Sequence, residues 1–136
     1  MEQDPQELRG AIALRTEVFC VEQGVPAEEE IDGRDDEAAH LVALDDGRVV
    51  GTLRLLLDGD QAKIGRVAVI KDRRRRGIAQ RMLEIAIDGA RERGCARASL
   101  ASQLYATELY ASVGFAVDSE VFEEAGMPHV WMRMRL

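Results

Sequence analysis

The stretch IGRVAVIKDRRRRGIA (residues 64–79) passes from an apolar, β-branched segment into four consecutive arginines and a glycine. From there to about residue 93, apolar side chains recur at helical spacing, so the arginines and Gly77 stand between a strand and a helix. At such a junction free backbone N–H groups and the positive end of the helix dipole converge, and arginine side chains add full charges. The pattern therefore predicts a site for a phosphate-bearing ligand.

Charge restricts what that ligand is. The 136 residues hold 18 Lys and Arg against 25 Asp and Glu, a net charge of -7. General nucleic-acid binding needs a broad basic face, whereas the basic residues cluster locally here. We therefore expect a small anionic ligand and no nucleic acid. A polyanion bound through residues 73–76 stays open as an alternative.

Length and composition favour one globular domain over residues 1–136. No apolar run approaches the roughly 20 residues that span a bilayer, and the first residues are acidic, so we expect no membrane contact and a cytoplasmic location. Cys20 and Cys95 lack the spacing of a metal site or a redox pair. We expect both to be free thiols and no metal to be bound.

The first half of the chain predicts a helix followed by an antiparallel meander. Asp4, Pro5 and Glu7 form a helix-start pattern, and an acidic stretch over residues 21–36 is expected to be a surface loop with room for one helical turn. Strands are expected at 40–44, 48–57 and 62–70, joined by two tight turns, the first at Asp46-Gly47. A classical Rossmann domain would place a helix between neighbouring strands, so it is excluded.

The second half alternates helices and strands. Helices are expected at 76–93 and 103–113, with a strand at 97–101 and further extended segments at 115–122 and 129–135. A long helix returns the chain parallel to the preceding strand. We therefore predict an α+β fold with a mixed, mostly antiparallel central sheet flanked by helices.

Two motifs resemble signatures of the GNAT superfamily of acyl-CoA N-acyltransferases. The first is Arg74-x-x-Gly77-x-Ala79 after the strand Val67-Ala68-Val69, and the second is Gln103-x-x-Ala106-x-x-Leu109-Tyr110-x-x-x-Gly114-Phe115. Further segments, including Val21-Glu22-Gln23-Gly24-Val25-Pro26 and Gly126-Met127-Pro128-His129, are similar to the ElaA-like (YjcF-like) group. Only Met1 to Gln3 precede the predicted cap, so the short edge strand that usually opens the GNAT fold is expected to be missing, truncated or replaced.

The resemblance implies that acetyl-CoA is the acyl donor. Its pantetheine would lie along the strand at 67–69, where a free N–H near Val69 would stabilise an oxyanion. Its pyrophosphate would meet the arginine loop, with Gly77 allowing close backbone approach. The donor-binding residues implied are Val67, Ala68, Val69, Arg74, Arg75, Arg76, Gly77, Ile78, Ala79, Gln103 and Tyr110.

The chemistry also needs a proton donor for the departing thiolate and a base for the acceptor amine. Tyr110 is the expected acid because of its place in the second motif. The alternative is that Tyr110 is a core residue whose hydroxyl is solvated at the surface. Glu22 and His129 are the expected base candidates, while Asp32, Glu123 and His40 are also available.

The acceptor is expected near the first helix and the following motif. Arg15, Glu22 and Arg66 are candidates for binding it. Arg15 falls on the apolar face of its helix, so it either extends past the core edge or aims into a cleft. Arg66 has the alternative of a solvated place on a sheet face.

The sequence thus predicts an N-acyltransferase that moves an acetyl group to an amine on a small molecule or peptide by direct attack. A CoA-binding sensor without turnover is the alternative. Exposed edge strands and the apolar segment Val130-Trp131-Met132 are compatible with a homodimer. The identity of the amine is not encoded in any motif.

Overall fold

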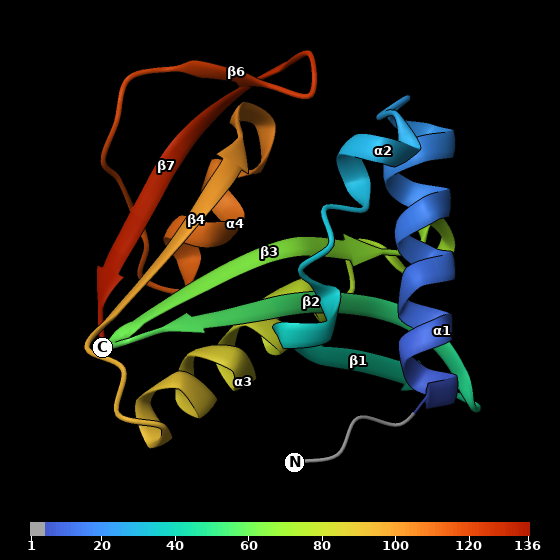
Figure 1. The fold of residues 1–136 in the computed structure, drawn as a ribbon, viewed down its shortest axis with the longest axis horizontal. Coiled ribbons are helices and arrows are strands. Elements are labelled where there is room, and N and C mark those ends of the chain that lie inside the picture. Colours follow the sequence, from blue (N-terminus) through green and yellow to red (C-terminus); the bar gives the residue numbers. More distant parts are fainter. Residues whose placement is uncertain (1–4) are drawn as a thin grey trace.

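A computed structural model describes residues 5–136, and its centre is one mixed sheet (Figure 1). Within these residues the sheet has seven strands in the order β1-β2-β3-β4-β7-β5, and β6 pairs with β7. The strands are β1 (Ala39–Asp45), β2 (Arg48–Asp58), β3 (Gln61–Val69), β4 (Arg97–Gln103), β5 (Ala116–Val117), β6 (Phe122–Glu124) and β7 (Met127–Arg135). Only β3 and β4 pair in parallel, which confirms the predicted mixed, mostly antiparallel sheet.

Helices cover both faces of the sheet. The elements are α1 (Pro5–Arg15), a π-helix η1 (Thr16–Glu22), α2 (Ala27–Glu30), α3 (Ile78–Glu92), α4 (Thr107–Ser112) and three short 3-10 turns, η2 (Asp35–Glu37), η3 (Lys71–Arg73) and η4 (Leu104–Ala106). The main core lies between α3 and the sheet, whereas Leu14 and Val18 pack with Ala68 and Ile70 in a second cluster. Because side chains alternate along a strand, the two clusters occupy opposite faces of β3.

The α3 helix packs on the sheet through an apolar stripe. Met82, Leu83, Ala86, Ile87 and Ala90 are buried there. The apolar spacing of the sequence predicts Ile85 on this stripe as well, but it is 42% exposed. At 100° per residue it lies well away from the centre of the stripe, so helical spacing found the face but misplaced its edge.

The hairpin between β1 and β2 forms as predicted. Asp45 pairs with Arg48, and the two residues between them, Asp46 and Gly47, have φ angles of 54° and 79°. Two positive φ angles define the type I′ turn that Asp-Gly favours, because its twist matches that of the strands.

Several predicted boundaries differ from the structure. The predicted cap Asp4 and the position of an edge strand before α1 lie outside the described residues, because α1 begins at the first of them. The helix expected at 103–113 consists of η4 and the shorter α4. The acidic stretch at 21–36 contains the helical turn that the sequence allows, α2, but its Glu30 is 3% exposed and does not lie at the surface.

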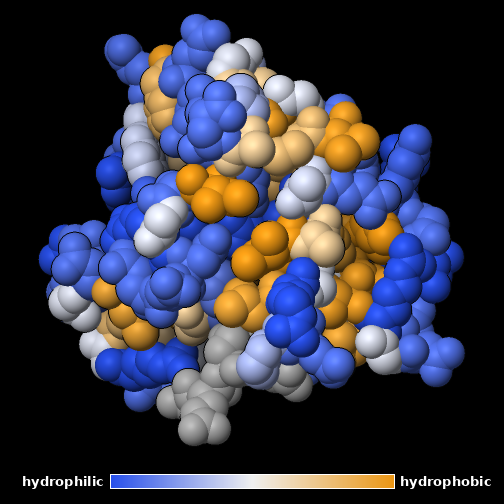
Figure 2. Space-filling view, turned by 45° about the vertical axis from the view of Figure 1, so that its right-hand side comes forward, coloured by the Kyte–Doolittle hydropathy of each residue, from blue (hydrophilic) through white to orange (hydrophobic). Residues whose placement is uncertain are grey.

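The surface is unevenly polar. Figure 2 shows hydrophobic residues gathered around a hollow to the right of centre, beside strongly hydrophilic ones. Among the large apolar side chains, Val21, Ile31 and Tyr105 are more than half exposed. No helix in residues 5–136 is long and apolar enough to cross a membrane.

Candidate functional site

The separation of β3 from β4 creates the main cavity. Their parallel pairing joins only Gln61–Lys63 of β3 to Arg97–Ser99 of β4. Beyond these residues the strands diverge (Figure 1), and a cavity of about 930 Å³ is lined by residues of both strands, the arginine loop, α4 and the β6–β7 turn. It is lined by every predicted donor-binding residue except Arg76. The end of β3 therefore presents a backbone edge that β4 does not pair.

The arginine loop delivers the start of α3 to this cavity. Gly77 precedes the helix with a φ of 78°, and no side chain caps the first turn, so its backbone N–H groups are open to a ligand. A Cβ built on Gly77 would meet nothing within 4 Å. Within the protein, glycine is thus favoured by backbone conformation and not by close packing.

The four arginines have different roles. Arg73 donates to Asp45 at 3.0 Å, and Arg74 donates to the Val69 carbonyl at 2.8 Å and to Glu22 at 3.0 Å. Arg75 and Arg76 are exposed, and among residues 5–136 neither has a partner. The uncommitted positive charge of the loop therefore comes from Arg75 and Arg76, whereas Arg74 has only Nη1 without a hydrogen bond among the described residues.

Tyr110 projects from α4 into the same cavity. It is 8% exposed, packs edge-on against Phe115 at 6.4 Å, and its hydroxyl has no hydrogen-bond partner among the described residues. Burial raises the pKa of Tyr110, and nearby Tyr105 adds to this. The hydroxyl is therefore protonated at neutral pH and free to donate to a bound group.

The ring of His129 has a defined orientation. Its Nδ1 lies 2.8 Å from the carbonyl oxygen of Met127. Because a carbonyl can only accept, Nδ1 must carry the proton, which leaves Nε2 with a lone pair when the ring is neutral. Nε2 lies 3.7 Å from a carboxylate oxygen of Glu124, and both residues line the cavity. This arrangement suits a base whose charged form is stabilised by a carboxylate.

Glu22, the other predicted base, is not among the cavity-lining residues. Its carboxylate pairs with Arg74 instead. The next residue, Gln23, lines the cavity instead of Glu22. Its side-chain oxygen accepts a hydrogen bond from Gln103 at 2.9 Å. The sequence reasoning missed Gln23, Glu124 and Arg54 as cavity residues, because only the fold brings these separate segments together.

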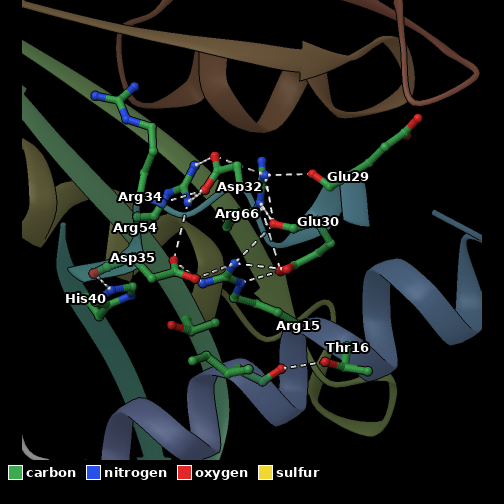
Figure 3. A network of polar contacts seen from close by, with 12 residues as sticks. Arg15, Thr16, Glu29, Glu30, Asp32, Arg34, Asp35, His40, Arg54 and Arg66 are labelled. Carbon is green, nitrogen blue, oxygen red and sulfur yellow. Dashed lines mark hydrogen bonds and ion pairs between the residues drawn. The ribbon is translucent and has the colours of Figure 1, made fainter. Parts of the chain in front are cut away.

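A buried ion network lies beside the cavity, between α1, α2 and β2 (Figure 3). Arg15 is 1% exposed and pairs with Glu30 and Asp35. Arg54 donates from both terminal nitrogens to Asp32 at 2.8 Å and from one of them to Asp35 at 3.3 Å. The network thereby pairs two buried arginines with the buried Glu30 and with Asp35 and Asp32, which are partly exposed.

This network corrects the prediction for Arg15. The side chain neither extends to solvent nor reaches the cavity, because both edges of its guanidinium bind carboxylates inside the protein. Arg66 does line the cavity, with its side chain 25% exposed. Of the two arginines predicted to bind the acceptor, only Arg66 lines the cavity.

The network also shifts two carboxyl groups. The hydrogen bonds from Arg54 lower the pKa of Asp32 well below its ordinary value of 3.8. Burial would raise the pKa of Asp35, but hydrogen bonds and charge from Arg15 and Arg54 outweigh it and lower that pKa as well. Both groups are therefore more acidic in the folded chain than in the unfolded one.

Acid should weaken the fold through these groups. Since the folded state holds fewer protons, the stability they contribute is complete above about pH 5 and is lost progressively as the pH falls further. Urea unfolding between pH 6 and pH 3 measures the loss. The Asp32→Asn variant should be less stable at pH 6 and should lose less stability on acidification. Equal acid sensitivity in both proteins would contradict a role for Asp32.

The comparisons with known proteins agree with this geometry. A family model described as "Acetyltransferase (GNAT) domain" matches residues 3–136. The "Uncharacterized N-acetyltransferase YjcF" of Bacillus subtilis is 35% identical over 128 residues, covering 93% of this chain and 91% of that protein. These matches extend over nearly the whole chain.

Solved structures share the fold. An acyl-CoA N-acyltransferase from Pseudomonas aeruginosa has a TM-score of 0.86 at 35% identity, and Escherichia coli ElaA has a TM-score of 0.86 at 29% identity. Each alignment covers 97% of this chain and 92% of the other. A more distant Bacillus subtilis acetyltransferase, solved in complex with CoA, has a TM-score of 0.75 at 18% identity and covers 100% of this chain and 95% of its own.

Proposed function

The chain belongs to the GNAT acetyltransferase family, and on that premise we propose that it transfers an acetyl group from acetyl-CoA to the amine of a small molecule or peptide. One observation carries the proposal: the diverging strands β3 and β4 bring the arginine loop, the free edge of β3 and the Tyr110 hydroxyl to one cavity. The CoA bound to the Bacillus subtilis neighbour supports the choice of donor.

The cavity fits the parts of a CoA donor. The open N–H groups at the start of α3 and the side chain of Arg75 line the cavity and suit the pyrophosphate, and exposed Arg76 adds positive charge next to them; neither arginine has a partner among residues 5–136. The free backbone at the end of β3 suits the amide groups of pantetheine, which can bond to it as an added strand would. Acetyl-CoA supplies the carbonyl that the amine attacks and the thiolate that leaves.

Tyr110 donates to the sulfur as the thiolate departs. Its hydroxyl is protonated at neutral pH and has no partner among the described residues, so no existing bond must be broken first. Neither cysteine is placed to form an acyl-enzyme, because Cys20 and Cys95 are both absent from the residues lining the cavity. Direct attack by the amine follows.

His129 takes the proton from the attacking amine through Nε2. The hydrogen bond from Nδ1 to Met127 fixes the ring, and Glu124 faces the positive charge that forms. Glu22 is less suited to this role, because Arg74 holds its carboxylate outside the lining of the cavity.

Steady-state release of CoA from acetyl-CoA, measured with a broad panel of amines, tests the function. We expect turnover with a subset of amines and no burst of acetylated enzyme. CoA binding without turnover on any amine would favour the sensor alternative. Tight binding of DNA that CoA does not displace would favour the polyanion alternative.

Replacing His129 by Gln should lower kcat about 100-fold at neutral pH, because general base catalysis typically contributes that much or more. The variant would depend on amine that is already neutral in solution. Its deficit should therefore shrink as the pH is raised toward the pKa of the acceptor, and pH profiles of kcat for both proteins measure this.

Glu22→Gln is the matched control and should leave the shape of that profile unchanged. If this variant showed the pH-dependent deficit and His129→Gln did not, Glu22 would be the base.

A further inference from the structure

The carboxylates of the buried network leave no oxygen unpaired for a substrate ammonium group. Both oxygens of Glu30 and both of Asp35 accept hydrogen bonds from Arg15, and both of Asp32 accept from Arg54. Two arginine nitrogens in or beside the network make no hydrogen bond among residues 5–136, and both are donors. One is the buried Nε of Arg54, and the other is Nη1 of the adjacent Arg66.

The guanidinium of Arg66 is bound mainly through Nε and Nη2 to a backbone carbonyl, and no carboxylate of the described residues forms a close ion pair with it. Its Nε and Nη2 donate to the backbone carbonyl of Glu30 at 3.3 and 3.0 Å, and the nearest carboxylate oxygens, on Asp32 and Glu30, lie at 3.5 and 3.9 Å. Nη1 makes no hydrogen bond within residues 5–136, and Figure 3 shows that end of the guanidinium without a dashed line. Its positive charge is thus only partly balanced.

The backbone at Arg66 is strained to achieve this. Arg66 has a φ of 53°, which residues with a side chain rarely adopt. The register between β2 and β3 shifts here, so that Arg66 and Val67 of β3 stand opposite the single residue Leu53. Such a bulge redirects a side chain, and the strain is maintained by the surrounding structure.

We propose that Nη1 of Arg66 binds a carboxylate of the acceptor, so that the preferred acceptors are amino acids and related amines that carry a carboxylate. This rests on the transfer function proposed above. The acceptor would lie in the cavity between Arg66 and His129, both of which line it, with its carboxylate at Arg66 and its amine at Nε2 of His129. Each carboxylate of the network is already bound to an arginine, so the network does not offer an unpaired negative charge to a cationic acceptor.

Matched acceptors test this directly. Each of a panel of L-amino acids is compared with its own carboxamide, which keeps the side chain and the amine but removes the negative charge. With acetyl-CoA saturating, kcat/KM is expressed per neutral amine, because the two amines differ in pKa. A hydrogen bond to a charged group is worth about 1.5–3 kcal/mol, so we expect the amino acid to be favoured roughly 10- to 100-fold.

Arg66→Gln should remove most of this preference, chiefly through KM for the amino acids. Arg66→Lys should restore part of it. Arg91→Gln removes an exposed arginine on α3 that pairs with Asp88 and is absent from the cavity lining, so it should keep the full preference. Equal rates for amino acids and carboxamides in the unaltered protein would overturn the proposal. So would an equal loss for both acceptors in Arg66→Gln while thermal unfolding and CoA affinity are unchanged.

A binding experiment separates this proposal from the transfer function. Amino acids and their carboxamides are titrated into the protein saturated with CoA, and the heat of binding is measured. A binding preference for the amino acid that disappears in Arg66→Gln would support the role of Arg66 even if no acceptor were acetylated. In that case only the proposed acetyl transfer would be contradicted. Absence of the preference would overturn the role of Arg66, whatever the rate of transfer.

Discussion

Replacing Tyr110 by Phe should lower kcat for acetyl transfer by roughly 10²- to 10³-fold, since a positioned proton donor typically contributes this much. The change removes one oxygen that has no hydrogen-bond partner among the described residues, so the folded state should lose little stability. Edge-on packing of the ring against Phe115 is retained. Initial rates of CoA release with the best amine of the panel, together with calorimetric titration of CoA, separate loss of chemistry from loss of binding.

Tyr105→Phe is the matched control. Tyr105 is 77% exposed and its hydroxyl accepts a hydrogen bond from Gln23 at 3.3 Å, so its removal should change kcat little. An unchanged kcat in Tyr110→Phe would assign the proton to solvent or another group. A loss in CoA affinity without a loss in kcat would make Tyr110 a binding residue.

The parts of the fold with strong local signals were predictable. Asp46-Gly47 specifies its turn by backbone preference, and the apolar spacing of α3 is visible over 15 residues. The two GNAT motifs then indicate the remaining topology. The short strands β5 and β6, of two and three residues, were not separable in sequence, because their pairing with β7 and not their own composition defines them.

The donor side of the site was more predictable than the acceptor side. Residues 67–69 and 74–79 lie close together in the sequence, so one motif predicts most of the donor-binding residues. The acceptor side depends on contacts between distant segments. Nothing local in Glu28-Glu29-Glu30 shows that the last of these turns inward to meet Arg15, fifteen positions earlier. The only available signal was an arginine on the apolar face of α1, which required a buried partner that the sequence could not identify.

The buried partner of Arg15 is Glu30, and its charge should contribute strongly to stability. Glu30→Gln should destabilise the fold by about 3 kcal/mol or more, because removing one member of a buried ion pair leaves the other charge uncompensated. Among the described residues, Arg15 would keep one carboxylate partner, Asp35, which Arg54 also binds. For a domain of this size, with a typical stability of about 5–15 kcal/mol, that is a large fraction. Unfolding in guanidinium chloride, with slopes compared between variants, gives the value.

Two further variants separate charge burial from other causes. Glu28→Gln makes the same chemical change on an exposed residue of α2, and should alter stability by no more than about 0.5 kcal/mol. The double variant Arg15→Met/Glu30→Leu removes both charges at once, and should recover much of the loss because apolar side chains often replace a buried pair without cost. Equal losses in Glu28→Gln and Glu30→Gln would show that the pair contributes no more than a surface contact. Recovery in the double variant, accompanied by a weaker preference for amino acids over carboxamides, would instead indicate that the network is retained to hold Glu30, and through its carbonyl Arg66, in place for the acceptor.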